Sequence, residues 1–101
     1  MDHIAGRTFL VTGGSSGLGL ETARLLLARG AQVAVTGRDR ARLDAAAARL
    51  PGVLAIRADA TSTADWRRCL AEVHARWGRL DALVNNHGAG VRIAPLEQPP
   101  A

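Results

Sequence analysis

The 101-residue sequence predicts an α/β fold, in which helices cover both faces of a parallel β-sheet. Two observations lead to this prediction. Short apolar runs of strand length alternate with longer stretches of helical periodicity, an order typical of parallel sheets. Glycine-rich segments follow the first and the fourth of these runs, where strands are expected to end.

Four apolar runs fit buried strands, because valine, leucine, isoleucine and alanine dominate them. We expect these strands at Thr8–Val11, Gln32–Thr36, Val53–Ala58 and Asp81–Asn85. The last part of the chain contains three prolines and predicts no regular element. The expected organisation is therefore one domain over residues 1–90, followed by an irregular tail over residues 91–101.

Three stretches between the strands have the spacing of helices that bury one face. We expect them at Leu18–Arg29, at Arg40–Leu50 and from Ser62 to Trp77. Gly30 fits the stop of the first helix and Asp39 fits the N-terminal cap of the second. Ser62 and Asp65 have the spacing of a capping box at the start of the third.

The connections predict a strand order of 3-2-1-4. Right-handed crossovers place the first three strands side by side in reverse order and the fourth strand on the other side of the first. The order reverses between the first and fourth strands, and open sheets of this kind bind ligands there, at the carboxyl ends. Both glycine-rich segments fall on that edge of the sheet.

The composition excludes several chemistries within this chain. There is no tyrosine, and all 13 basic residues are arginine. A tyrosine acid, a phosphate-loop lysine and Schiff-base catalysis are therefore excluded. The net charge of +4 is spread along the chain without a basic block or interleaved aromatics, so we expect no nucleic-acid partner.

The cysteine content and the hydropathy exclude further classes of protein. Cys69 is the only cysteine, which excludes an internal disulfide, and no Cys or His cluster has zinc-ligand spacing. Cys69, Trp66 and Trp77 share one face of the third helix, so we expect them to pack in the core rather than to hold a ligand. No apolar run is long enough to span a membrane and the start lacks a signal peptide's layout. We expect a soluble, cytoplasmic protein.

The first glycine-rich segment, Thr12–Gly19, follows a strand and opens a helix, which is the context of a phosphate-binding loop. Gly13 permits a sharp turn, Gly17 lets the backbone approach a pyrophosphate, and Gly19 permits close packing of the helix on the strand. The free N–H groups of the helix start then favour an anion.

Taken together, the two motifs resemble the short-chain dehydrogenase/reductase family over residues 5–97, nearly the whole chain. The residues that carry the resemblance are Thr12-Gly13-x-x-x-Gly17-x-Gly19 and Asn85-Asn86-x-Gly88. The resemblance implies a Rossmann-like fold and hydride transfer between a nicotinamide dinucleotide and a carbonyl or alcohol. It also implies that Asp59 contacts adenine, that the Asn-Asn-x-Gly turn lies beside the adenine ribose, and that Asn85 ties neighbouring strands together.

On these grounds we predict one set of cofactor-binding residues and no metal site. The predicted residues are Gly13, Ser15, Ser16, Gly17, Leu18, Gly19, Arg38, Asp59, Ala60, Asn86 and Gly88. Dinucleotide sites that take NAD place an acid at the end of the second strand, where this chain has Thr36, Gly37 and Arg38. Arg38 can pair with a 2′-phosphate, so we expect NADP(H) to be preferred over NAD(H).

For Arg38, Asp59 and His87, a purely structural interpretation stands beside the functional one. Arg38 is alternatively one more solvated arginine, and Asp59 an ordinary loop aspartate. His87 stands where the family has a small residue; its pKa suits acid–base work, but we interpret it as a variant whose backbone makes the contact.

In the family, hydride transfer needs a serine, a tyrosine and a lysine downstream of the Asn-Asn-x-Gly turn. This chain reaches Ala101 without a tyrosine or a lysine. We therefore expect a truncated, cofactor-binding half with no catalytic residue, able to act on a small-molecule substrate only if a C-terminal half completes it. The alternatives are a non-catalytic dinucleotide-binding module and a defunct remnant. We also expect Leu83 and Val84 to lie at an uncovered strand edge through which homo-oligomers would form.

Overall fold

The computed structural model describes residues 3–14, 17–87 and 90–95, with side chains described through residue 86. Strands and helices alternate along the chain until a final pair of strands. The elements are β1 (Thr8–Thr12), α1 (Gly17–Ala28), β2 (Gln32–Gly37), α2 (Arg40–Ala48), β3 (Leu54–Arg57), α3 (Thr63–Trp77), β4 (Ala82–His87) and β5 (Gly90–Pro95).

All five strands form one sheet in the order β3-β2-β1-β4-β5. The first four strands are parallel, which confirms the predicted order 3-2-1-4, and β5 runs antiparallel to β4. In the central strand, Val11 lies opposite Val35 of β2 and Val84 of β4. Parallel pairing in this register brings the carboxyl ends of β1, β2 and β4 to the same edge of the sheet.

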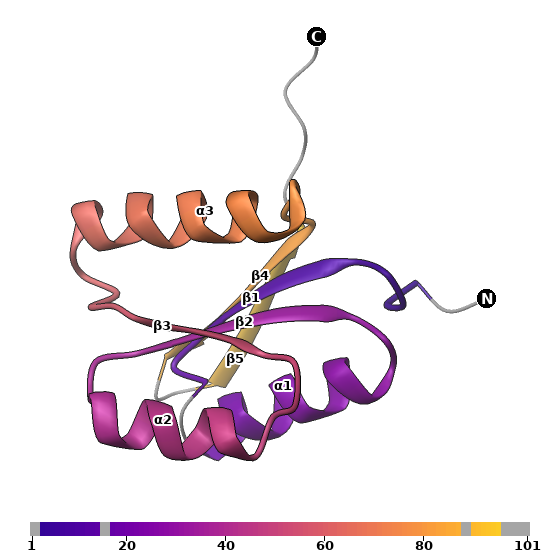
Figure 1. Cartoon of the computed structure of the whole chain (residues 1–101), viewed down its shortest axis with the longest axis horizontal. Coiled ribbons are helices and arrows are strands. Elements are labelled where there is room, and N and C mark those ends of the chain that lie inside the picture. Colours follow the sequence, from indigo (N-terminus) through magenta and orange to yellow (C-terminus); the bar gives the residue numbers. More distant parts are fainter. Residues whose placement is uncertain (1–2, 15–16, 88–89, 96–101) are drawn as a thin grey trace, which may run out of the picture.

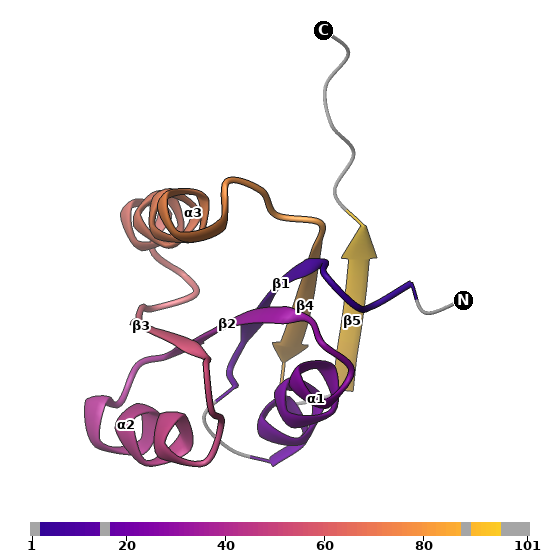
Figure 2. The same cartoon turned by 45° about the vertical axis from the view of Figure 1, so that its right-hand side comes forward.

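Helices α1 and α2 cover one face of the sheet and α3 covers the other (Figures 1 and 2). Side chains alternate between the faces of a strand, so neighbouring residues of β1 belong to different cores. Phe9 and Val11 belong to the core under α1 and α2, whereas Leu10 belongs to the core under α3. Cys69 is 2% exposed in that second core, as the helical spacing predicts.

The prediction of an irregular tail from residue 91 is wrong for residues 91–95, which lie in β5; residues 96–101 are outside the described part of the chain. Pro95 ends β5, on an edge of the described sheet, where the missing N–H of proline is tolerated. Asn85 lies in the fourth strand as predicted, but the turn expected to follow it begins later, because Asn86 and His87 also lie within β4. β5 pairs along β4, so the uncovered edge expected at β4 is absent from the described sheet.

The starts of α2 and α3 follow the predicted caps. The Asp39 carboxylate accepts hydrogen bonds from the N–H groups of Ala41 and Arg42 at 2.9 and 3.2 Å. Ser62 Oγ accepts from the N–H of Asp65 at 3.1 Å. Among the described helices, none has the length and apolar character needed to cross a membrane.

Candidate functional site

A cleft of about 460 Å³ opens at the carboxyl ends of the parallel strands. Its lining residues stand at the ends of β1, β2 and β3, at the start of α2 and in the second half of β4. They are Thr12, Gly13, Thr36, Gly37, Arg38, Asp39, Arg42, Ala58, Asp59, Ala60, Thr61, Asn85 and Asn86. The cleft therefore occupies the position that the strand order predicts for a ligand.

The floor of the cleft is the glycine turn after β1. Gly13 has a φ of +66°, a backbone conformation that glycine adopts without the steric cost of a side chain. Gly19, in the first turn of α1, has no room for a side chain, because a Cβ there would lie 2.3 Å from the carbonyl oxygen of Gly13. The start of α1 is thus pressed against the turn, with the positive end of the helix dipole beside the cleft.

Polar side chains fasten this turn to β4. The Thr12 hydroxyl donates to Asn85 Oδ1 at 2.9 Å, and it accepts from the Asn86 N–H at 3.2 Å. The Asn86 amide donates to the carbonyl of Gly13, also at 3.2 Å. Asn85 thus bonds to the neighbouring strand, which agrees with the bracing role that the resemblance implies for it.

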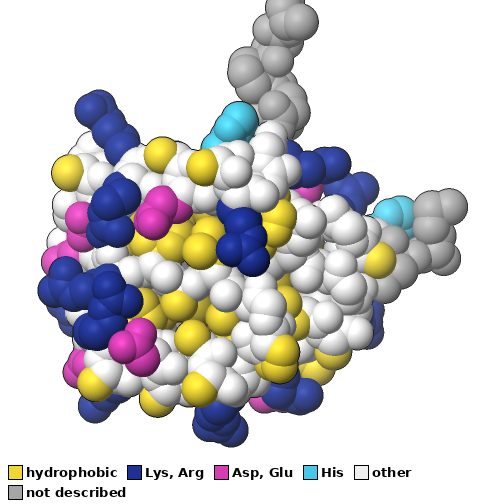
Figure 3. All heavy atoms as spheres, in the orientation of Figure 1, with side chains coloured by type: hydrophobic (Ala, Val, Ile, Leu, Met, Phe, Trp, Pro, Cys, Tyr) yellow, Lys and Arg dark blue, Asp and Glu magenta, His cyan; other side chains and the backbone are white. Residues whose placement is uncertain are grey.

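One wall of the cleft is basic. Arg38 follows β2, Arg42 lies one helical turn further on in α2, and both line the cleft. The only acid beside them in sequence, Asp39, is held by the helix cap. Within the described part of the chain, neither Arg38 nor Arg42 forms an ion pair. In the space-filling view, basic side chains gather at the left-hand edge between the levels of α2 and α3 (Figure 3).

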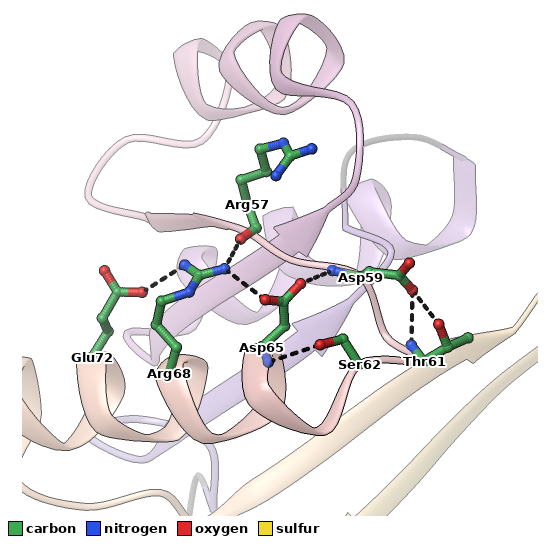
Figure 4. Close-up of polar contacts among 7 residues, drawn as sticks. All are labelled: Arg57, Asp59, Thr61, Ser62, Asp65, Arg68 and Glu72. Carbon is green, nitrogen blue, oxygen red and sulfur yellow. Dashed lines mark hydrogen bonds and ion pairs between the residues drawn. The ribbon is translucent and has the colours of Figure 1, made fainter.

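The loop from β3 to α3, which carries Asp59, also lines the cleft. Asp59 Oδ1 accepts from the backbone N–H of Thr61 at 2.9 Å and from the Thr61 hydroxyl at 2.7 Å (Figure 4). These two hydrogen bonds, and the positive charge of Arg38, lower the pKa of Asp59. The carboxylate is therefore ionised at neutral pH and acts only as an acceptor.

A network on α3 supports this loop from behind. Asp65 Oδ2 accepts from the N–H of Asp59 at 2.8 Å, and this bond is the main cause of the lowered pKa of Asp65. Arg68 contacts Asp65, Glu72 and the carbonyl of Arg57 (Figure 4). In a complete capping box the Asp65 carboxylate would accept a hydrogen bond from the backbone N–H of Ser62. Here it accepts from the N–H of Asp59 instead, so only the Ser62 half of the box is formed.

The structure brings five of the predicted cofactor residues together in the cleft: Gly13, Arg38, Asp59, Ala60 and Asn86. Gly17, Leu18 and Gly19 lie beside it, in the first turn of α1. Ser15, Ser16 and Gly88 are outside the described residues, as is the side chain of His87.

Sequence reasoning missed Arg42 among the charged residues of the cleft lining. Its spacing of four residues from Arg38 at the start of a helix was the available signal, since such residues share a helix face.

Comparison with known proteins agrees with this geometry. A family model described as short chain dehydrogenase matches residues 7–99. The 3-beta-hydroxysteroid dehydrogenase of Comamonas testosteroni is 43% identical over 88 residues, which cover 86% of this chain and 35% of the relative. The L-fucose dehydrogenase of Bos taurus is 40% identical over 84 residues, covering 83% of this chain and 31% of the relative.

Two solved structures share the fold at a similar level of identity. A short chain dehydrogenase from Bacillus anthracis has a TM-score of 0.79 and 31% identity, covering 85% of this chain and 36% of its own. The 3-ketoacyl-(acyl-carrier-protein) reductase of Brucella melitensis, complexed with NADH, has a TM-score of 0.75 and 30% identity. That match covers 79% of this chain and 34% of the reductase. The chain thus spans about a third of the length of these proteins. With its glycine turn, its strand order and a family match over residues 7–99, the chain belongs to the short chain dehydrogenase family.

Proposed function

We propose that this chain binds NADP(H) in preference to NAD(H), as the cofactor-binding part of an oxidoreductase that transfers hydride between the dinucleotide and a carbonyl or alcohol. The observation that carries the proposal is the pairing of two features in one cleft. A glycine turn at a helix start forms its floor, and Arg38 and Arg42 form a wall that lacks a free acid.

Each part of the cleft suits one part of the dinucleotide. The turn at Gly13 and the start of α1 would hold the pyrophosphate, because helix N–H groups and the helix dipole favour anions. Arg38 and Arg42 would pair with the 2′-phosphate. Asp59 and Ala60 would meet the adenine, and Asn86 would lie beside the ribose. The volume of about 460 Å³ is within the range of small-molecule sites, roughly 300–1,000 Å³.

The absence of an acid at the end of β2, where Thr36 and Gly37 stand, supports the preference for the phosphorylated cofactor, and the next acid, Asp39, is held by the helix cap. NAD sites use an acid there to accept from the ribose 2′-hydroxyl, and its charge would repel a 2′-phosphate. Here the strand ends in Thr36 and Gly37, and Arg38 follows. A charge-assisted hydrogen bond to a phosphate contributes roughly 1.5–3 kcal/mol.

We further propose that the chain contributes binding and not proton transfer. When bound, the cofactor supplies the hydride, while this chain's own residues orient it and shield one side of it. Tyrosine and lysine are absent from the sequence, so a tyrosine acid or a lysine would have to come from further protein that also completes the substrate site. The same absence favours a second candidate, a dinucleotide-binding module without catalysis.

Calorimetric titration of the chain with NADPH and with NADH tests the proposal. We expect NADPH to bind at least about tenfold more tightly, corresponding to about 1.4 kcal/mol. Equal affinity, or tighter binding of NADH, would contradict the preference for phosphate. No binding of either nucleotide would contradict the binding function and favour a defunct remnant.

A further inference from the structure

The loop between β3 and α3 is held by two neighbouring side chains of α3. Asp65 Oδ2 accepts from the N–H of Asp59 at 2.8 Å, and the indole N–H of Trp66 donates to the carbonyl of Ala60 at 2.9 Å. Consecutive helix residues thus bond to consecutive loop residues. The backbone on either side of the Asp59 carboxylate is fixed relative to the helix.

The polar groups of Asp65 and Trp66 both bond to the loop, although neither the capping position of Asp65 nor the packing of Trp66 in the core requires such a bond. In a capping box Asp65 would bond the N–H of Ser62, but that N–H donates to the carbonyl of Asp59 at 3.0 Å instead. Trp66 packs against the core under α3, where a phenyl ring would supply the same apolar contact. Its N–H is the part that reaches the loop.

The bonds within the loop leave one oxygen of Asp59 for a ligand. Oδ1 is occupied by the N–H and the hydroxyl of Thr61. No described residue donates to Oδ2. The side chain lies in the cleft wall, so Oδ2 is an acceptor whose direction depends on the loop backbone.

We propose that Asp65 and Trp66 are positioning residues that aim Asp59 Oδ2 at the base of the bound nucleotide, and so favour a base that offers an amino group over one that offers a carbonyl. This inference rests on the proposed function, because it takes Asp59 to lie at the adenine end. Adenine has a 6-amino group where hypoxanthine has a carbonyl oxygen. A carboxylate aimed at that atom bonds the amino group and repels the carbonyl.

The test compares NADPH with its hypoxanthine analogue by calorimetry. The readout is the dissociation constant of the hypoxanthine analogue divided by that of NADPH, so a larger ratio means a stronger preference for adenine. Trp66→Phe removes the indole donor and keeps an aromatic ring. We expect this variant to reduce the preference for adenine roughly 3–10-fold, the effect of one misdirected hydrogen bond. Trp77→Phe is the matched control, because Trp77 is partly buried on the same helix and its ring faces Arg76 rather than the loop. Its ratio should stay within about twofold of the unaltered chain.

A second pair of variants tests Asp65 independently of Trp66. Asp65→Ala should reduce the ratio as Trp66→Phe does, whereas Asp65→Asn should restore most of it, because an amide oxygen can accept the same N–H. Variants that weaken both nucleotides equally, with an unchanged ratio, would overturn the positioning role and leave the proposed function intact. Failure of the unaltered chain to bind either nucleotide would overturn both.

Discussion

The carboxylate of Asp81 accepts a hydrogen bond from the backbone N–H of Thr8 at 2.7 Å, and the N–H of Asp81 donates to the carbonyl of Thr8 at 2.9 Å. The start of β1 is thereby joined to the residue before β4, across 73 positions of sequence. Burial raises the pKa of Asp81, but the hydrogen bonds from Arg79 and Thr8 outweigh it and leave the pKa below its usual value. This pair holds the amino-terminal ends of the two central strands together, opposite the cleft.

Replacing Asp81 should therefore destabilise the fold. Asp81→Ala leaves the N–H of Thr8 without its side-chain partner, and we expect the free energy of unfolding to fall by about 1–3 kcal/mol. Urea denaturation measures the change. Asp44→Ala is the control, since Asp44 is exposed and pairs with exposed Arg40 on the same helix; its effect should stay within about 0.5 kcal/mol. A loss as small as the control's would contradict the structural role of Asp81.

Acid should destabilise the chain through its aspartates. The pKa values of Asp59, Asp65 and Asp81 are lowered in the folded chain, so the unfolded chain binds more protons as pH falls. The stability they contribute is complete above the unfolded pKa of about 3.9 and is lost as pH falls through the lower folded values. Urea midpoints measured downward from neutral pH should stay level and then drop below about pH 4. Midpoints that rise on acidification would contradict these shifts.

Replacing Arg38 or Arg42 in the cleft wall should weaken the binding of NADPH but not that of NADH. Arg38→Ala should weaken NADPH roughly 10–100-fold and leave NADH nearly unchanged, because NADH has no 2′-phosphate to pair with the guanidinium. Arg42→Ala should have the same selectivity with a smaller effect. The measurement is calorimetric titration with each nucleotide.

Arg40→Ala provides the matched control for charge. Arg40 lies on the same helix and pairs with Asp44, and it is absent from the lining of the cleft. Its removal changes the net charge as much as removal of Arg42 does. If all three variants weakened NADPH alike, general electrostatics rather than a phosphate site would explain the preference.

A methyl group on Gly19 should damage the cleft although alanine is the better helix former. Gly19→Ala places Cβ against the carbonyl of Gly13 and the amide of Asn86, both of which are held by other contacts. We expect a loss of about 1–3 kcal/mol in the free energy of unfolding, together with weaker binding of both nucleotides.

Gly78→Ala is the control that introduces backbone strain without a steric clash. Gly78 ends α3 with a φ of +76° and has open space around its Cβ position. Alanine there should cost about 1 kcal/mol of stability without affecting nucleotide binding. Retained binding in Gly19→Ala would show that the turn and helix can separate without loss of the site.

The parts of this structure that could be predicted are those whose cause is local. The strand order follows from apolar runs, helical spacing and the handedness of crossovers, and the caps at Asp39 and Ser62 follow from residue type. β5 is missed because three prolines in the last seven residues indicate an irregular tail, although Val91 and Ile93 have the alternation of a strand and β5 pairs with β4. Asn85 and Asn86 have turn-forming side chains, but bonds to Thr12 and Gly13 keep them extended.

The site shows the same division. Arg38 and the glycines are marked by their place after a strand, whereas the bond from Asp59 to Asp65 exists only because a helix folds back on the loop before it. Sequence spacing suggested a capping box for Asp65, and the competing donor was found only in three dimensions.

The central position of β1 has a consequence for how this chain reaches its native state. β1 has neighbours on both sides, and one of them, β4, begins only at Ala82. A nascent chain can pair β1 with β2 early, but the other edge of β1 stays unpaired until β4 has been synthesised. Contacts of such long sequence separation slow folding, and until they form, the open edge of β1 can pair with other chains.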